Sequence, residues 1–152
     1  DAFIRNKLET LLKYDIIPIL CVGETLEQRR NNKFEETVVS QVRNCLSGIE
    51  SELMNGNLVL AYEPIWAIGT GENASPEQAR RMHMIIRKEL ATLFSEEKAD
   101  NIRILYGGSV NPKNVGFLLS LEEIDGVLVG GASLDPFQFK ELLDFNKQHS
   151  SN

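Results

Sequence analysis

The sequence predicts an α/β protein with a parallel sheet, in which strands and helices alternate along the chain. Three observations predict this fold class. Short apolar runs without period-2 alternation, such as residues 58–62, are typical of strands buried on both faces. Glycine or proline closely follows each run, and a helix comes next, which in three of the four units opens with a capping residue. Alternating βα units require right-handed crossovers, so we expect the strands to run parallel beneath covering helices.

Four such units follow an opening helix at residues 3–12, and together they predict one domain over residues 1–152. Ser75, with Pro76 and Gln78, opens the longest helix through a capping box, while Asn111 and Asp135, each followed by proline, open two others. Pro18 is unfavourable inside the first strand. We expect strands at 16–22, 58–62, 102–106 and 126–129, and helices at 34–49, 75–94, 113–119 and 135–145.

Four strands do not close an eight-stranded barrel, which typically takes about 250 residues. Asp1 is not an initiator, and a helix with no strand ahead of it opens the chain. We therefore expect that the beginning of the chain is missing. The four strands would form either half of a (β/α)₈ barrel or a small, open, doubly wound sheet. In both architectures, ligands bind at the carboxyl ends of the strands.

The composition excludes several classes of function. The formal net charge is −6 and no short cluster of Lys and Arg is present, so nucleic acid is not an expected partner. No apolar stretch approaches 18 residues and no targeting segment is recognisable, so we expect neither a membrane span nor secretion, and a cytoplasmic location. Cys21 and Cys45 form no CxxC pair and have no nearby histidine, which predicts reduced thiols and no metal site.

Glu63 is the strongest candidate for a catalytic residue. It follows the strand at 58–62, at the carboxyl edge of the predicted sheet. Its apolar and aromatic neighbours would disfavour the charged form by desolvation and make it a stronger base. A structural acid paired with a cation would occupy the same position. Residues 64–74 then form a long connection between firm anchors, a pattern typical of a lid over a site.

Two glycine-rich turns end the last two predicted strands, Gly107-Gly108-Ser109 and Gly130-Gly131. Glycine lets the backbone approach an oxygen-rich ligand, and N–H groups near a helix start attract phosphate without any Lys or Arg. Tight turns alone would explain either pair. Their occurrence at successive strand ends favours a phosphate site.

Other motifs carry weaker predictions. Residues 69–74 match a G-x-G-x-x-A dinucleotide fingerprint, but five residues separate it from its strand and the next strand ends in Tyr106 rather than an acid, which disfavours a nicotinamide cofactor. His83 is expected at the surface or the edge of the core, and His149 in a polar tail. Glu24 is expected to fix neighbouring loops.

Four segments together resemble the triosephosphate isomerase family: YEPIWAIGTG at 62–71, YGGSV at 106–110, GGASL at 130–134 and CVGE at 21–24. They occur in the family's order, and the resemblance covers essentially the whole chain. It implies a TIM barrel and the cofactor-free interconversion of dihydroxyacetone phosphate and glyceraldehyde 3-phosphate through an enediolate. This reaction belongs to glycolysis and gluconeogenesis.

The resemblance also implies roles for individual residues. Glu63 would be the base that moves the proton between two carbons. Tyr106, together with Ser109, would hold a lid shut over the substrate by hydrogen bonds. The backbone N–H groups that bind the phosphate would be those of Gly69, Ser109, Gly130 and Gly131, and the lid would comprise Pro64, Ile65, Trp66, Ala67, Ile68, Thr70 and Gly71.

Family members also carry an N-terminal half, with an Asn and a Lys after the first strand and a His after the fourth, and none of that region matches this chain. The resemblance therefore implies the C-terminal half of the barrel, poorly active until the missing half is supplied. The family's dimer contacts come largely from the missing portion, so the homodimer is not carried over. A phosphate-binding half-barrel without isomerase activity and a dinucleotide-dependent oxidoreductase are the alternatives.

Overall fold

The protein folds around a parallel sheet of four strands. The computed structural model describes residues 1–50, 53, 57–68 and 73–145. The strands are β1 (Ile19–Val22), β2 (Val59–Tyr62), β3 (Arg103–Tyr106) and β4 (Gly126–Val127), in the spatial order β1-β2-β3-β4. Every neighbouring pair is parallel, which confirms the predicted α/β class.

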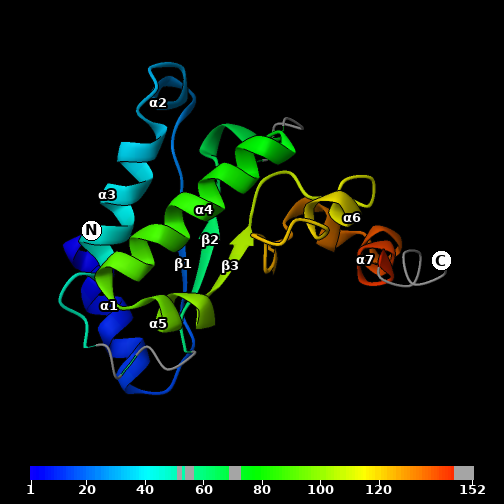
Figure 1. Cartoon of the computed structure of the whole chain (residues 1–152). Coiled ribbons are helices and arrows are strands. Elements are labelled where there is room, and N and C mark those ends of the chain that lie inside the picture. The colour runs from blue at the N-terminus through cyan, green and yellow to red at the C-terminus, as the bar shows by residue number, and fades with distance from the viewer. Residues whose placement is uncertain (51–52, 54–56, 69–72, 146–152) are drawn as a thin grey trace.

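Helices connect successive strands (Figure 1). Two single turns of 3₁₀-helix, η2 (Ile65–Ala67) and η3 (Gly131–Leu134), lie in the connections that follow β2 and β4. None of the helices described is long and apolar enough to cross a membrane. The α-helices are α1 (Ala2–Lys13), α2 (Leu26–Arg30), α3 (Phe34–Leu46), α4 (Pro76–Leu93), α5 (Glu96–Asn101), α6 (Val115–Leu118) and α7 (Pro136–Leu143).

The predicted caps start two of the helices. The Ser75 hydroxyl accepts a hydrogen bond from the Gln78 amide at 3.2 Å, and the Gln78 side chain accepts one from the Ser75 amide at 2.8 Å, which completes the capping box of α4. Asp135 caps α7 differently: its carboxylate accepts hydrogen bonds from the amides of Phe137 and Gln138. The Asn111 side chain accepts from the Lys113 amide, but α6 begins only at Val115, two residues later than predicted.

The core lies between the helices and one face of the sheet. Leu20, Leu60 and Ile104 point into it, and α3 and α4 lie side by side over that face (Figure 1). The opposite face of β1 is open, because Ile19 is 48% exposed and Cys21 is exposed as well. Burial on both faces is therefore confirmed for the centre of β2 but not for the edge strand β1.

Several element boundaries differ from the prediction, and two short helices were not predicted. β1 begins at Ile19 rather than at residue 16, because Pro18 has no N–H to donate to the ladder, and Ile16 and Ile17 before it are exposed. β4 is two residues shorter than expected. Helices α2 and α5, of five and six residues, were not predicted, because such short helices display too few turns for a 3.6-residue period to show.

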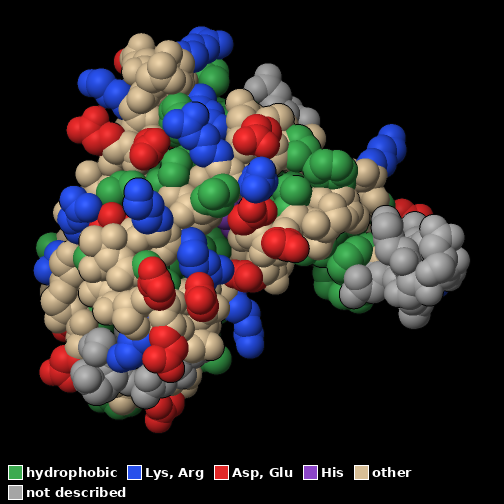
Figure 2. All heavy atoms as spheres, in the orientation of Figure 1, with side chains coloured by type: hydrophobic (Ala, Val, Ile, Leu, Met, Phe, Trp, Pro, Cys, Tyr) green, Lys and Arg blue, Asp and Glu red, His purple; other side chains and the backbone are tan. Residues whose placement is uncertain are grey.

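The surface combines a mixed charge distribution with an apolar region at the C-terminal side. Lys, Arg, Asp and Glu side chains intermingle over the helical face (Figure 2). Around α7, which lies at the outer end of the molecule beyond α6 (Figure 1), the side chains of Leu134, Phe137 and Leu143 are exposed. Large apolar side chains at neighbouring exposed positions are typical of a surface that another element covers.

Candidate active site

The register of the sheet brings the ends of three strands to one edge. The amide of Glu63 donates to the Val22 carbonyl at 2.8 Å, that of Gly107 to the Tyr62 carbonyl at 2.8 Å, and that of Leu128 to the Tyr106 carbonyl at 2.9 Å. These bonds continue the ladders in which Val22, Tyr62 and Tyr106 are direct partners. Glu63, Gly107 and Leu128 consequently lie side by side at the carboxyl edge.

A pocket of about 510 Å³ opens at this edge. It gathers Glu63 and both glycine-rich turns, which are far apart in the sequence. Of the predicted lid, Ile68 lines the pocket, whereas Gly69, Thr70 and Gly71 lie outside the described residues. The predicted catalytic and phosphate-binding residues that line it are Glu63, Ser109, Gly130 and Gly131.

Gly107 and Gly108, in the glycine-rich turn that follows β3, leave space for two side chains of the protein itself. A Cβ atom placed on Gly107 would lie 2.5 Å from Cγ of Glu63, and one on Gly108 would lie 2.1 Å from the Tyr106 hydroxyl oxygen. Both separations are far below van der Waals contact. Gly107 thus lets the Glu63 side chain lie across the strand end, a role that sequence reasoning missed because it assigned these glycines to the ligand.

Short side chain to backbone hydrogen bonds hold both turns. The side-chain nitrogen Nδ2 of Asn114 donates to the Ser109 carbonyl at 2.8 Å, while its side-chain oxygen Oδ1 accepts from the backbone amide of Asn111 at 2.8 Å. The Ser133 hydroxyl donates to the Gly130 carbonyl at 2.7 Å. Asn114 was not a predicted site residue, although asparagine just before a helix often makes such contacts. These hydrogen bonds fix the backbone of the two turns that line the pocket.

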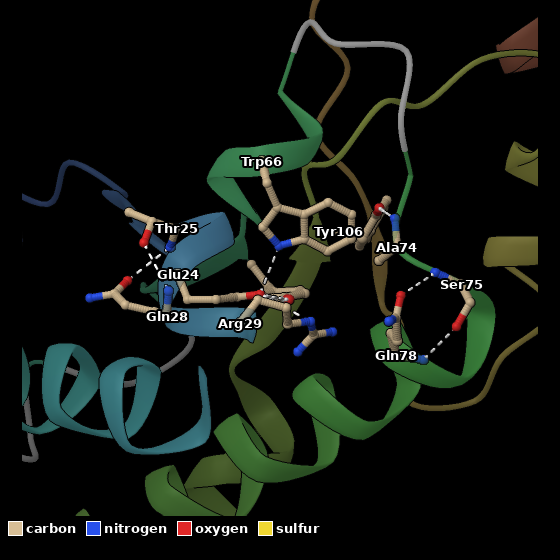
Figure 3. A network of polar contacts seen from close by, with 10 residues as sticks. Glu24, Thr25, Gln28, Arg29, Trp66, Ala74, Ser75, Gln78 and Tyr106 are labelled. Carbon is tan, nitrogen blue, oxygen red and sulfur yellow. Dashed lines mark hydrogen bonds and ion pairs between the residues drawn. The ribbon is translucent and has the colours of Figure 1, made fainter. Parts of the chain in front are cut away.

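The start of the 64–74 connection is anchored by a buried acid, Glu24 (Figure 3). The Tyr62 hydroxyl donates to Glu24 at 3.2 Å, and the Trp66 indole Nε1–H donates to it at 2.9 Å. Arg29 forms an ion pair with the same carboxylate at 3.5 Å. Burial and the nearby Glu24 charge raise the pKa of Tyr62, so its hydroxyl stays protonated. The predicted structural role of Glu24 in fixing neighbouring loops is confirmed.

The end of the same connection is anchored by Tyr106. Its hydroxyl accepts a hydrogen bond from the Ala74 amide at 3.1 Å, directly before the capping box of α4 (Figure 3). Between the anchors, Pro64 and Ala67 are buried, whereas Ile65 is exposed. Both ends of the connection are therefore fixed to the sheet, and closure of a lid between them stays a prediction.

Cys21 lies next to the candidate base. Desolvation and the hydrogen bond and charge of the neighbouring Glu63 raise the pKa of Cys21 to about 11, so the thiol is protonated at neutral pH. A protonated thiol is a weak nucleophile but a hydrogen-bond donor. Cys21 thus contributes a neutral neighbour to Glu63, a contact that the parallel pairing of β1 with β2 creates.

His83 corrects a prediction. It was expected at the surface or the edge of the core, but its side chain is completely buried. Its Nδ1 lies 3.1 Å from the Glu123 carbonyl, and burial lowers its pKa to about 4. The signal was present in the sequence, because His83 is four residues after Ala79 and three before Ile86, both of which lie on the buried stripe of α4.

These features define the class of protein. It is an α/β protein with a pocket at the carboxyl ends of parallel strands, lined by Glu63 and two glycine-rich turns. The family model described as Triosephosphate isomerase matches residues 1–146. The chain belongs to the triosephosphate isomerase family.

Curated relatives agree with this assignment. The triosephosphate isomerase of Finegoldia magna is 50% identical over 147 residues, which are 97% of this chain and 59% of the relative. That of Lactobacillus gasseri is 50% identical over 145 residues, or 95% and 57%. That of Thermus thermophilus is 51% identical over 143 residues, or 94% and 57%. The chain therefore spans somewhat more than half the length of the curated relatives it matches.

Proposed function

We propose that this chain carries the base and the phosphate site of a triosephosphate isomerase, which interconverts dihydroxyacetone phosphate and glyceraldehyde 3-phosphate through an enediolate. The observation that carries the proposal is that Glu63 shares one pocket with Ser109, Gly130 and Gly131. A base and backbone donors around one pocket suit a small phosphorylated carbonyl compound.

In this proposal Glu63 removes a proton from one carbon of the triose and returns it to the neighbouring carbon. The geometry supports the role, because Gly107 leaves space for the side chain and Cys21 offers a neutral thiol beside it. The reaction is internally balanced, since one proton moves from the first carbon to the second and the hydroxyl proton moves from one oxygen to the other. It needs no oxidant or cofactor.

Backbone N–H groups of Ser109, Gly130 and Gly131, with Gly69 from the lid, bind the phosphate in this proposal. Among the described residues that line the pocket there is no Lys, Arg or His, so the dipoles of the backbone would supply the positive potential. Glycine at 130 and 131 leaves that backbone accessible, since no atom lies within 4 Å of an added Cβ at either position. The lid, residues 64–71, would then exclude water from the enediolate, held by Tyr106 and Ser109.

The architecture we propose is a single domain that forms the C-terminal half of a TIM barrel, from the helix after strand four through the last βα unit. The exposed face of β1 and the apolar side chains around α7 support it, because a doubly wound sheet would have helices on both faces.

The missing half would supply the Asn, Lys and His of the family. We therefore expect low activity from this chain alone, since removal of one oxyanion donor typically costs about 10²–10³ in rate. The homodimer of the family is not part of this proposal, and the proposed location of the protein is the cytoplasm.

A half-barrel that binds phosphate without isomerase chemistry is the second candidate. It is favoured by one observation: among the described residues that line the pocket, Glu63 is the only ionisable side chain. A dinucleotide-dependent oxidoreductase has less support, because η2 separates the glycine-rich stretch from β2.

Turnover of glyceraldehyde 3-phosphate tests the proposal. The chain is assayed alone and after addition of the N-terminal half of a family member, beside Glu63→Gln and the matched control Glu96→Gln, an exposed acid in α5. We expect activity to rise on complementation, to vanish in Glu63→Gln and to persist in the control. A complemented complex that binds a non-reacting triose phosphate analogue but never turns over would support the binding module instead.

A further inference from the structure

His83 is a buried polar side chain that the proposed reaction does not use. It lies in the middle of α4, away from the residues that line the pocket. The Glu123 carbonyl, 3.1 Å from Nδ1, can only accept a hydrogen bond, so Nδ1 must carry the proton of the neutral ring. The other nitrogen, Nε2, is buried and has no hydrogen-bond partner among the described residues. A single hydrogen bond to the Glu123 carbonyl does not by itself explain why a histidine, rather than an apolar residue, is buried at position 83.

The ring of His83 lies against both tyrosines that anchor the 64–74 connection. Its centroid is 6.1 Å from that of Tyr62, with the two planes at 89°, an edge-to-face contact. It is 6.5 Å from that of Tyr106, with the planes at 36°. The two tyrosine rings are themselves 6.3 Å apart. All three separations fall in the range over which aromatic rings attract one another.

Each tyrosine holds a different end of the connection. Tyr62 donates to Glu24, which also accepts from the Trp66 indole, whereas Tyr106 accepts from the Ala74 amide. The hydroxyl groups depend on the positions of the rings, and both rings are fully buried. One imidazole therefore lies against the rings of both anchoring tyrosines.

We propose that His83 is a positioning residue whose ring, acting through Tyr62 and Tyr106, couples the two anchors of the 64–74 connection. The hydrogen bond to the Glu123 carbonyl satisfies Nδ1, while the contacts of the ring with both tyrosines carry the coupling. Since burial lowers the pKa of His83 to about 4, the ring is neutral at pH 7 and adds no charge against the two tyrosine rings. The coupling does not depend on the proposed isomerase activity; only its consequence for Glu63, the neighbour of Tyr62, does.

Amide and indole hydrogen exchange, measured by NMR on the full chain, tests the coupling. The chain has one tryptophan, so the Trp66 indole N–H gives a unique signal for the first anchor, and the Ala74 amide reports the second. His83→Asn keeps a donor for the Glu123 carbonyl but removes the ring, whereas His83→Phe keeps a ring and removes the donor. Met84→Ala, at an exposed neighbouring position of α4, is the control, and the buried Val42 amide in α3 reports global opening.

We expect His83→Asn to accelerate exchange at Trp66 and Ala74 together, on the order of tenfold, the effect of losing about one hydrogen bond's stability. His83→Phe and Met84→Ala should change neither by more than about twofold. If His83→Asn does not fold, His83→Leu, which fills volume without a ring, serves in its place. The proposal is overturned if only one anchor responds, if neither does, if Val42 accelerates equally, or if the Phe variant matches the Asn variant.

Discussion

Gly23→Ala should both destabilise the protein and displace Glu63. A Cβ atom on Gly23 would lie 1.8 Å from the Glu63 carbonyl oxygen, whereas ordinary contact begins at 3.4 Å, so the two strand ends must separate by about 1.6 Å (3.4 − 1.8). Neither end is able to yield easily. Gln41 binds both the amide and the carbonyl of Gly23, at 2.9 and 3.0 Å, and the Glu63 amide is held by Val22 at 2.8 Å.

Because the clash involves backbone rather than a flexible side chain, we expect the upper end of the usual cost of overpacking, a loss of about 3 kcal/mol in the free energy of unfolding. Urea unfolding followed by circular dichroism measures it, with the surface variant Thr92→Ala as control. If Glu63 is the base, as we propose, a displacement of about 1 Å of its side chain should also reduce the turnover of the complemented complex about 10²-fold. A Gly23→Ala protein within about 0.5 kcal/mol of the parent would refute the reasoning.

Three further outcomes are expected. Glu24→Gln should lower the free energy of unfolding by about 2–4 kcal/mol in urea, because a neutral amide no longer balances the partly buried Arg29 charge and has one oxygen fewer to accept from the Tyr62 and Trp66 donors; a loss below about 1 kcal/mol would contradict this. The contribution of neutral His83 to the free energy of unfolding is fully present above pH 6.5 and is lost as the pH falls towards 4, because between these values only the unfolded chain binds a proton at His83. We therefore expect the free energy of unfolding to be about 2 kcal/mol lower at pH 5 than at pH 7.5, and His83→Phe should not show this loss. Alkylation of Cys21 by iodoacetamide at pH 8 should be about 100-fold slower than that of an unperturbed thiol and faster in Glu63→Gln; equal rates in the two proteins would show that the carboxylate does not influence the thiol.

Much of the fold was predictable because local patterns encode it. The apolar run before Glu63 and the capping box at Ser75 each depend on residues close in sequence, and both appear where predicted. Pro18 indicated that the first strand would be shorter, because proline has no N–H to donate to the ladder at its own position. The buried side of α4 was also readable, although His83 was assigned by its polarity rather than by its place on that stripe.

The sequence by itself determined the α/β class, the candidate base Glu63 and the two glycine-rich turns, because strand ends and helix starts follow from neighbouring residues. Only the tertiary structure decided that Glu63 lies across Gly107 and beside Cys21, and that His83 contacts both anchoring tyrosines. These contacts join residues some twenty to forty-five positions apart. They arise from the parallel register and the packing of α4 on the sheet, which are set by how whole elements bury their apolar faces and not by any local pattern.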